Sequence, residues 1–194
     1  MRKAVAILFA CTLVVSACSQ SADSPKDGES LEDLPTNAQS EPYEDDSDIV
    51  KVTLSYPDGN ISAEGDYLNG KKVGSWTEFH PNGVVKSVSG YVNGLKQGAH
   101  VEIDNTGRLT KKAYYHNDQL HGVYKEYKLA RVKEERIYKN GELNGLVKIY
   151  YDNGSILEES LYLNGKRHGL AKWYDQEGNV TIEYEYENGE LVKK

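Results

Sequence analysis

The sequence predicts an all-β protein, an elongated antiparallel β-meander built from tandem β-hairpin repeats of about 24 residues. One tyrosine recurs at a fixed interval, with spacings of 24, 24, 23, 24 and 24 residues. A period of this length indicates a tandem array in which each repeat buries its surface against its neighbours. The stretches between turn signals alternate and are rich in Tyr, Val, Ile and Thr, which is typical of strands. The marker tyrosines are Tyr67, Tyr91, Tyr115, Tyr138, Tyr162 and Tyr186.

Residues 1–17 have the organisation of a secretory signal peptide. Arg2 and Lys3 precede an apolar segment, Ala4 to Val15, that is too short to span a bilayer and is followed by small residues. The sequence Val15-Ser16-Ala17-Cys18 then resembles the lipobox of bacterial lipoproteins. That resemblance implies that Cys18 carries the lipid and becomes the mature N-terminus, so that the chain is anchored to a membrane.

An ordinary secretory signal with an incidental cysteine is the alternative. The other cysteine, Cys11, lies within the segment that would be removed, so the mature chain has no disulfide framework. Ser19 follows Cys18, and the absence of Asp at this position favours the outer membrane over inner-membrane retention. The sequence therefore predicts that this protein is an outer-membrane lipoprotein of the bacterial cell envelope.

Residues 18–49 are predicted to form a disordered acidic linker. Positions 19–48 hold ten acidic side chains and one basic side chain, with little apolar surface to bury. A solvated spacer and an acidic interaction tail both fit this composition. The remaining array, residues 50–194, is balanced in charge, with 20 acidic and 20 basic side chains from position 51 onward. This balance gives no reason to expect nucleic acid as a partner.

Two kinds of turn organise residues 50–194. Asn-Gly recurs once per repeat and favours a two-residue type I′ hairpin turn, because both of its central residues need positive φ. The second kind, as in Pro81-Asn82-Gly83, suits a three-residue loop. This geometry predicts the cross-strand pairs Phe79–Val85, Ile103–Leu109, Tyr150–Ile156 and Tyr174–Val180. Two-residue loops at Asp58-Gly59 and Leu129-Ala130 would add Tyr56–Ile61 and Tyr127–Val132.

Uninterrupted alternation would place these pairs on one face together with the marker tyrosines, Val123, Leu146 and Leu170. The opposite face would be mostly polar, except for an apolar patch toward the carboxyl end. Such a patch suits protein binding, whereas a curled sheet would make it a second core. The predicted patch consists of Tyr114, Tyr124, Ile137, Val147, Ile149, Leu157, Leu161 and Trp173.

The frame Tyr-x-Asn-Gly-x-x-x-Gly, followed by an aromatic residue as in Gly74-Ser75-Trp76, resembles the bacterial MORN-repeat variant. That repeat occurs in the group labelled YwqK-type toxin–antitoxin antitoxins, so the resemblance implies neutralisation of a toxin by binding. The frame is broken at Asn117-Asp118 and at Arg131, where glycine is replaced. A lipid anchor would make an immunity-like role in the envelope more natural than a cytoplasmic one.

No pattern in the sequence points to catalysis, a cofactor or a metal. The five histidines lack the closely spaced His and Cys partners of a zinc site. Adjacent acidic residues such as Glu158 and Glu159 point to opposite faces of a strand, which is poor geometry for acid–base chemistry. We therefore expect a module that binds an envelope protein, and the resemblance implies that this partner is a toxin. A structural spacer or assembly scaffold is the alternative, and an enzyme is disfavoured.

Overall fold

The computed structural model describes residues 34–44 and 46–192 as a single antiparallel sheet. Among these residues no helix is long and apolar enough to cross a membrane. The predicted all-β meander of hairpin repeats is confirmed. The strands are β1 (Ala38–Tyr43), β2 (Asp46–Ser55), β3 (Ile61–Leu68), β4 (Lys71–Phe79), β5 (Val85–Val92), β6 (Leu95–Ile103), β7 (Leu109–His116), β8 (Gln119–Leu120), β9 (Gly122–Lys128), β10 (Arg131–Lys139), β11 (Glu142–Leu143), β12 (Gly145–Tyr150), β13 (Ile156–Leu163), β14 (Lys166–Tyr174), β15 (Val180–Glu187) and β16 (Glu190–Leu191).

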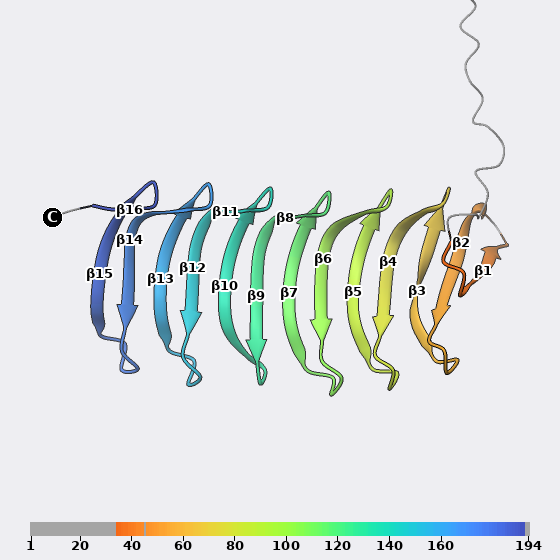
Figure 1. The fold of residues 1–194 in the computed structure, drawn as a ribbon, viewed down its shortest axis with the longest axis horizontal. Helices are drawn as coiled ribbons and strands as arrows, with labels where there is room; N and C mark the ends of the chain where they lie inside the picture. Colours follow the sequence, from red (N-terminus) through yellow and green to blue (C-terminus); the bar gives the residue numbers. More distant parts are fainter. Residues whose placement is uncertain (1–33, 45, 193–194) are drawn as a thin grey trace, which may run out of the picture.

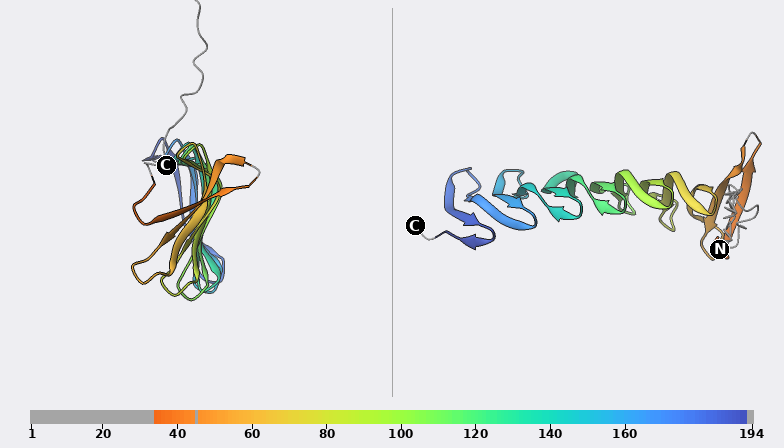
Figure 2. Two further views of the ribbon diagram at one scale, coloured as in Figure 1. Left: turned by 90° about the vertical axis from the view of Figure 1, so that its right-hand side faces the viewer. Right: turned by 90° about the horizontal axis from the view of Figure 1, so that it is seen from above.

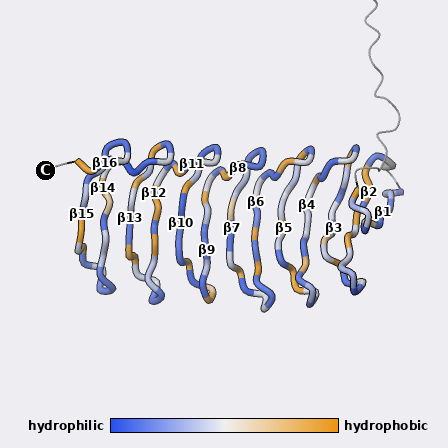
Figure 3. The backbone as a smooth tube through the Cα atoms, viewed as in Figure 1, coloured by the Kyte–Doolittle hydropathy of each residue, from blue (hydrophilic) through white to orange (hydrophobic). Residues whose placement is uncertain are grey.

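The strands lie side by side in chain order, so the molecule is a long single row with turns along both of its edges (Figure 1). Seen along the row, the strands are bowed (Figure 2). Polar and apolar residues are interspersed along each strand, while the turns are mostly hydrophilic (Figure 3). The short strand β8 pairs only with β7, and the short strand β11 pairs only with β10. Both lie at the edge that carries the Asn-Gly turns.

The Asn-Gly turns have the predicted geometry. Asn69 has φ of 49° and Gly70 has φ of 72°, and the other Asn-Gly turns repeat this pattern. Asn117-Asp118, which lacks the glycine, keeps positive φ at both residues, at 48° and 63°. The second turn residue also bonds to the preceding repeat: Gly94 N donates to Lys72 O at 2.9 Å. This edge therefore joins successive repeats through backbone hydrogen bonds.

At the other edge, side chains join the repeats. The hydroxyl of Tyr56 donates to Phe79 O at 2.7 Å, and that of Tyr151 donates to Tyr174 O at 2.8 Å. His80 Nε2 contacts Ile103 O at 2.8 Å in the same way. Each contact spans 23 residues, which is one repeat. Repeats are therefore joined at both edges as well as through the sheet.

Five of the six predicted cross-strand pairs are confirmed. Phe79 lies opposite Val85, and Tyr127 lies opposite Val132 across the two-residue turn. The remaining pair, Tyr56–Ile61, is wrong, because Ser55 is the partner of Ile61. That turn includes Pro57 and has the three-residue form found elsewhere, with Gly59 N donating to Tyr56 O. The other confirmed pairs are Ile103–Leu109, Tyr150–Ile156 and Tyr174–Val180.

A register shift near these turns decides which face each side chain occupies. In the β4–β5 pair the shift falls between Glu78 and Phe79, and it recurs in the equivalent places of other repeats. Such a bulge interrupts the two-residue alternation of the strand. The prediction that Val123, Leu146 and Leu170 share a face with the marker tyrosines is therefore wrong. These three side chains lie on the opposite face and are exposed.

We call the face that carries the buried side chains the inner face, and the opposite one the outer face. Along the middle of the inner face, large and small residues alternate from strand to strand. Trp76 is 2% exposed and lies over Gly65, where an added Cβ would come within 2.5 Å of the indole ring. The same alternation continues through Ser89, His100, Ala113 and Tyr124. A single layer thus obtains a core because each large side chain leans over a small neighbour.

The ordered array begins before the predicted boundary at residue 50. Strand β1 pairs with β2 and places Glu41 opposite Lys51, while Ala38 packs against the core formed by Val52, Ala63, Tyr67 and Trp76. Within the predicted disordered linker, residues 38–43 and 46–49 therefore belong to strands β1 and β2. An exposed edge strand needs backbone pairing and little apolar burial, so acidic composition does not exclude it. Residues 18–33 of the predicted linker lie outside the described residues.

Candidate interaction surface

The predicted apolar patch divides between the two faces of the sheet. Val147 pairs with Ser160, whereas the neighbouring Leu146 pairs with Leu161, so Val147 and Leu161 face opposite ways. The register shifts beside these strands cause this division, because the extra residues, Leu157 in β13 and Thr181 in β15, leave Val147, Ile149 and Trp173 on the face of the marker tyrosines. Tyr124, Val147, Ile149 and Trp173 lie on the inner face, and Tyr114, Ile137 and Leu161 lie on the outer face. Leu157 is the extra residue at the register shift of β13 and has no partner in β12.

The inner members belong to the core of the array. Tyr124 is 9% exposed and Val147 is 5% exposed. Tyr124 donates its hydroxyl to Glu126 Oε1 at 2.6 Å, and burial together with this carboxylate raises the pKa of Tyr124. The Trp173 Nε1–H donates to Glu158 Oε2 at 3.1 Å. The interpretation as a second core is thus the better one for these four residues.

Glu158 is the centre of a buried polar cluster beneath Trp173. It is 8% exposed, accepts from Arg167 at 2.6 Å and accepts the Ser160 hydroxyl at 2.6 Å. The Arg167 guanidinium also lies 5.4 Å from the Trp173 ring and 5.9 Å from the Tyr162 ring. Both oxygens of the carboxylate are therefore hydrogen-bonded, which is the condition under which a buried charge is tolerated.

The outer members extend into a longer row of exposed apolar side chains. Ile137 pairs with Val123, and Leu161 pairs with Leu146. The row crosses the six strands β7, β9, β10, β12, β13 and β14, and its side chains are 36–49% exposed. We call it the apolar stripe. It comprises Tyr114, Val123, Ile137, Leu146, Leu161 and Leu170.

Backbone geometry holds the stripe open on its turn side. Ile137 lies against Gly145, where an added Cβ would come within 2.9 Å of the Ile137 Cβ. Gly145 also has φ of 138°, a conformation that side-chain-bearing residues rarely adopt. The stripe residue of β10 therefore packs on bare backbone of β12, which leaves its outward surface uncovered.

A ladder of charges borders the stripe on the other side. Lys148 Nζ lies 2.9 Å from Glu159 Oε1, Lys172 Nζ lies 3.2 Å from Glu183 Oε2, and Lys125 pairs with Glu135. The ammonium of Lys148 holds the pKa of Glu159 below its ordinary value. An apolar row of this length beside a charged row has the composition of a binding surface, apolar at its centre and charged at its rim.

The amino-terminal half of the array lacks this stripe. The equivalent row there carries Ser75 and Gly90, which pair with each other, and then Ala99, the partner of Tyr114. At its amino-terminal end Asp66 accepts a hydrogen bond from the Tyr43 hydroxyl at 2.9 Å. The large apolar side chains of this row therefore begin at Tyr114 and belong to the carboxyl-terminal half.

Sequence reasoning missed a buried polar chain on the inner face of the amino-terminal half. Ser89 Oγ lies 2.8 Å from His100 Nδ1, and His100 Nε2 lies 3.0 Å from Glu102 Oε1. Lys111 Nζ contacts the same carboxylate oxygen at 2.8 Å. Ser89 and His100 are each only 5% exposed, so neither can meet a substrate without an opening of the sheet. The chain satisfies polar atoms of the core; the register of strands β5 and β6 was the signal that could have revealed it.

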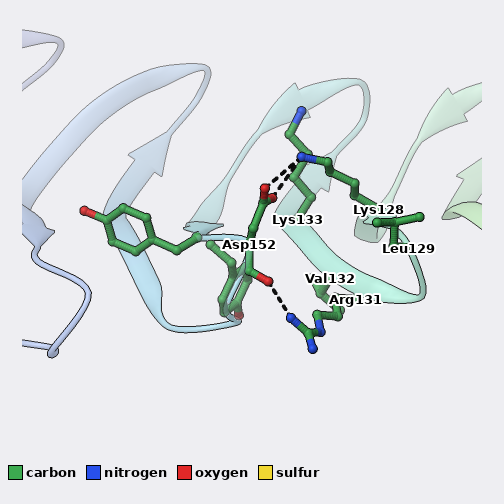
Figure 4. A pocket seen from close by; sticks show the side chains of 8 residues that line it. Lys128, Leu129, Arg131, Val132, Lys133 and Asp152 are labelled. Atoms are coloured by element: carbon green, nitrogen blue, oxygen red, sulfur yellow. Dashed lines mark hydrogen bonds and ion pairs between the residues drawn. The ribbon is translucent and has the colours of Figure 1, made fainter.

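A hollow of about 320 Å³ lies beside the two-residue turn at Leu129-Ala130. Here Lys128 Nζ contacts Asp152 Oδ2 at 2.9 Å, and Arg131 donates to Asp152 O at 2.7 Å (Figure 4). Leu129 is 71% exposed, which makes this turn an exception among hydrophilic turns. Because Lys128 and Asp152 are both largely exposed, their ion pair adds little stability.

The remaining sequence candidates form no cluster. His121 Nδ1 lies 3.2 Å from Asn140 Oδ1, and the ring of His116 lies 5.8 Å from that of His121. In the part of the chain that the structure describes, no three His, Cys, Asp or Glu side chains are grouped as metal ligands would be. Cys18, the predicted lipid attachment residue, and the signal segment 1–17 lie outside the described residues.

Three segments match the family model described as MORN repeat variant, at residues 72–93, 143–164 and 167–194. These hairpins are MORN-type repeats. The first two matched segments each run from the strand after one Asn-Gly turn to the asparagine of the next. The matches cover less than half of the chain, and the stretch between the first two holds Asn117-Asp118 and Leu129-Ala130, where the frame is broken. No curated protein matches the chain.

Proposed function

We propose that this chain is a lipid-anchored protein of the bacterial envelope whose MORN-type repeats bind another protein through the apolar stripe. The observation that carries the proposal is the row of six exposed apolar side chains beside a ladder of ion pairs. Exposed apolar side chains in a contiguous row favour association with a protein surface over hydration. The chain acts by binding in this proposal, and no catalytic step is assigned to it.

The finer proposal is that the partner is a toxin and that this chain is antitoxin- or immunity-like. It rests on the resemblance to antitoxins with MORN-type repeats and on the lipobox at Val15-Ser16-Ala17-Cys18. The lipobox supports an outer-membrane lipoprotein and hence a partner that acts in the envelope. Mass spectrometry of the mature N-terminus tests the anchor: a lipid-modified Cys18 supports it, and an unmodified Ser19 or Gln20 terminus contradicts it.

The binding test compares two double variants of the tagged lipoprotein in cross-linked envelopes. Leu146→Thr with Leu170→Thr removes two aliphatic side chains from the stripe, which are 36% and 49% exposed. Val92→Thr with Leu95→Thr is the matched control near an Asn-Gly turn, at 61% and 42% exposed. Substitutions at such exposed sites change stability by about 0.5 kcal/mol or less, so both variants stay folded.

One protein captured by the native form and the control, and lost with the stripe variant at unchanged melting temperature, is the expected result. If that protein is toxic when produced alone and harmless when this chain is produced with it, the antitoxin proposal is also supported. Equal capture by all three forms contradicts the role of the stripe. That outcome favours the second candidate, a spacer or assembly scaffold, which is suggested by an extended array whose repeats are joined at both edges.

A further inference from the structure

The hollow beside the Leu129-Ala130 turn lies where the repeat frame is broken. In two other repeats a tyrosine, Tyr56 or Tyr151, stands just before the turn and its hydroxyl reaches the next repeat. Lys128 stands in this place here, and its ammonium contacts the Asp152 carboxylate instead. Lys128 therefore brings no ring into the space between the two repeats, and a volume of about 320 Å³ stays open.

The backbone of this turn is not the one that its residues favour. Leu129 has φ of 50° and Ala130 has φ of 64°, a left-handed conformation that is uncommon for side-chain-bearing residues other than Asn and Asp. Burial does not offset this strain, because Leu129 is 71% exposed. Strain of this kind is concentrated at ligand-binding and active sites, so the turn marks the hollow as a candidate site.

The walls of the hollow are apolar on one side. They include Leu129 from the turn, Val132 of β10 and the Tyr150 ring of β12, and the last two are half-buried. A volume of about 320 Å³ is at the lower end of the range for small-molecule sites, which combine apolar walls with a few polar groups. The hollow therefore has room for a small organic molecule.

The polar groups at the rim carry more positive than negative charge. Asp152 is the carboxylate of the lining, and Lys128 Nζ lies 3.0 and 2.9 Å from its two oxygens. Arg131 donates to the backbone oxygen of Asp152. Lys133 makes no hydrogen bond or ion pair with any residue that the structure describes. An anion is therefore the ligand that this rim favours.

The two lysines are placed to share one anion. Figure 4 shows the ammonium ends of Lys128 and Lys133 directed to the same side of the hollow, with the Arg131 guanidinium on the other side of Asp152. The Asp152 side chain is 80% exposed, and an exposed ion pair contributes little to stability. Asp152 can thus give up part of its contact with Lys128 to an incoming carboxylate.

We propose that this hollow binds an organic carboxylate with a short apolar body. The carboxylate lies on the ammonium groups of Lys128 and Lys133, and the apolar body lies against Leu129 and Val132. A free organic acid and the last residue of a peptide chain share this chemistry. The hollow is separate from the apolar stripe, because Tyr150 is four residues beyond Leu146 along β12, or about 13 Å. This site and the proposed binding function therefore stand independently.

A second hollow provides the matched control. It also has a volume of about 320 Å³, but its lining holds two glutamates and two lysines, so its charge is balanced. Lys86 there pairs with Glu78 at 3.3 Å. Lys86→Met removes the same charge as Lys133→Met from a hollow of the same size, and it should not affect the proposed site.

Titration of the full chain in detergent micelles, followed by NMR of the backbone amides, tests the site. N-acetyl-leucine is expected to shift the amides of residues 128–133 and 150–152 and to bind with a Kd on the order of 1 mM, as its size allows. N-acetyl-leucinamide lacks the charge and acetate lacks the apolar body, so both should bind several times more weakly. Equal binding of either probe or of inorganic phosphate overturns the proposal, and so do shifts spread along the whole array.

The lysine variants test the role of the rim. Lys133→Met should weaken the binding of N-acetyl-leucine about two- to fivefold, the range for one exposed charge pair. Lys86→Met should leave the affinity unchanged. Equal losses in the two variants would mean that the probe responds to the net charge of the array, which contradicts a built site.

Leu129→Asn combined with Ala130→Gly gives a readout of the turn. Asn-Gly favours positive φ at both positions, so the melting temperature should rise. The binding of N-acetyl-leucine should weaken at the same time, because the apolar wall loses Leu129. A higher melting temperature with unchanged affinity would overturn the role of this turn in binding.

A peptide separates the two sources of the carboxylate. The probe is acetyl-Ala-Ala-Ala-Leu with a free carboxylate, compared with N-acetyl-leucine. Tighter binding of the peptide supports a peptide C-terminus as the ligand, and equal or weaker binding supports a free organic acid. The peptide amide is the control, and its binding as tightly as the free acid would contradict both sources.

Discussion

Trp76 and Ala171 occupy equivalent places on the inner face, four repeats apart, and their surroundings differ in a consistent way. Trp76 is 2% exposed, touches the edge of Tyr67 at a ring distance of 5.4 Å and lies under the Lys72 ammonium at 4.1 Å. Ala171 lies between Ser160 and Tyr184, while Leu161 and Leu170 on the outer face are 40% and 49% exposed. The amino-terminal half thus concentrates its apolar bulk inside, and the carboxyl-terminal half displays more of it outside.

This difference shows that one repeat frame can carry either a buried apolar core or an exposed apolar surface. Asn-Gly and three-residue turns recur in both halves, with the two-residue Leu129-Ala130 turn as an exception, so these turns specify the frame. The residues between the turns are free to vary in size as long as each cross-strand pair fills its space. A stable core at one end can therefore coexist with an exposed apolar surface at the other.

The largest expected effect is a difference in the free energy of unfolding between alanine substitutions of Trp76 and Trp173. Trp76→Ala should lower the free energy of unfolding by about 3–5 kcal/mol, the range for truncating a buried aromatic side chain. Trp173→Ala should cost about half of that or less, because Trp173 is only partly buried. Urea denaturation followed by circular dichroism measures both. Equal losses would show that the two halves are not distinct in packing.

A double-mutant cycle sharpens the contrast at Gly65. Gly65→Ala should cost about 1–3 kcal/mol, because the added methyl group overlaps the Trp76 ring. In a Trp76→Leu background the same substitution should cost much less, since the smaller side chain can move aside. Additive losses would mean that the penalty comes from the backbone at Gly65 and not from the large-over-small contact.

The smallest expected effect concerns the charge ladder of the carboxyl-terminal half. Lys148 lowers the pKa of Glu159 from the reference value of 4.5, so this carboxylate adds stability above the pKa of its unfolded form. That contribution is lost as the pH falls through the lower, folded pKa. Lys148→Met should therefore cost up to about 1 kcal/mol at neutral pH, and the difference from the native chain should shrink in acid. Lys71→Met, at an exposed residue of β4, is the control, and a constant difference for Lys148→Met would contradict the pairing.

The sequence predicted the turns, the repeat length and five of the six tested pairs, because Asn-Gly and glycine-ended loops constrain the backbone locally. It did not predict the faces correctly. Alternation along β4 separates Phe79 from Trp76, whereas alternation along β5 would place Val85, the partner of Phe79, on the face of Tyr91 and Trp76. The two hold together only if one strand has an extra residue, which is Lys86 in β5, and that conflict was the available signal.

Because the register shifts were not predicted, part of the predicted apolar patch was assigned to the wrong face. Three of the eight predicted patch residues, Tyr114, Ile137 and Leu161, were correctly placed opposite the marker tyrosines, and they lie on strands β7, β10 and β13. The misplaced four lie on β9, β12 and β14, which enter or leave a shifted turn. Val123, Leu146 and Leu170 were assigned to the scaffold for the same reason. Strand β1 was missed because its pairing with β2 depends on backbone bonds that composition does not report.

The alternation of large and small residues along the inner face also limits how such an array can change its length. Removing or duplicating a whole hairpin leaves a large residue beside a small one, as in the pairing of Trp76 with Ser89 or of His100 with Ala113. Removing a single strand would instead bring two large or two small side chains together. The alternation from Gly65 to Tyr124 is thus kept only when an even number of strands is added or removed there, whereas farther along the row Ser160 already pairs with the small Ala171.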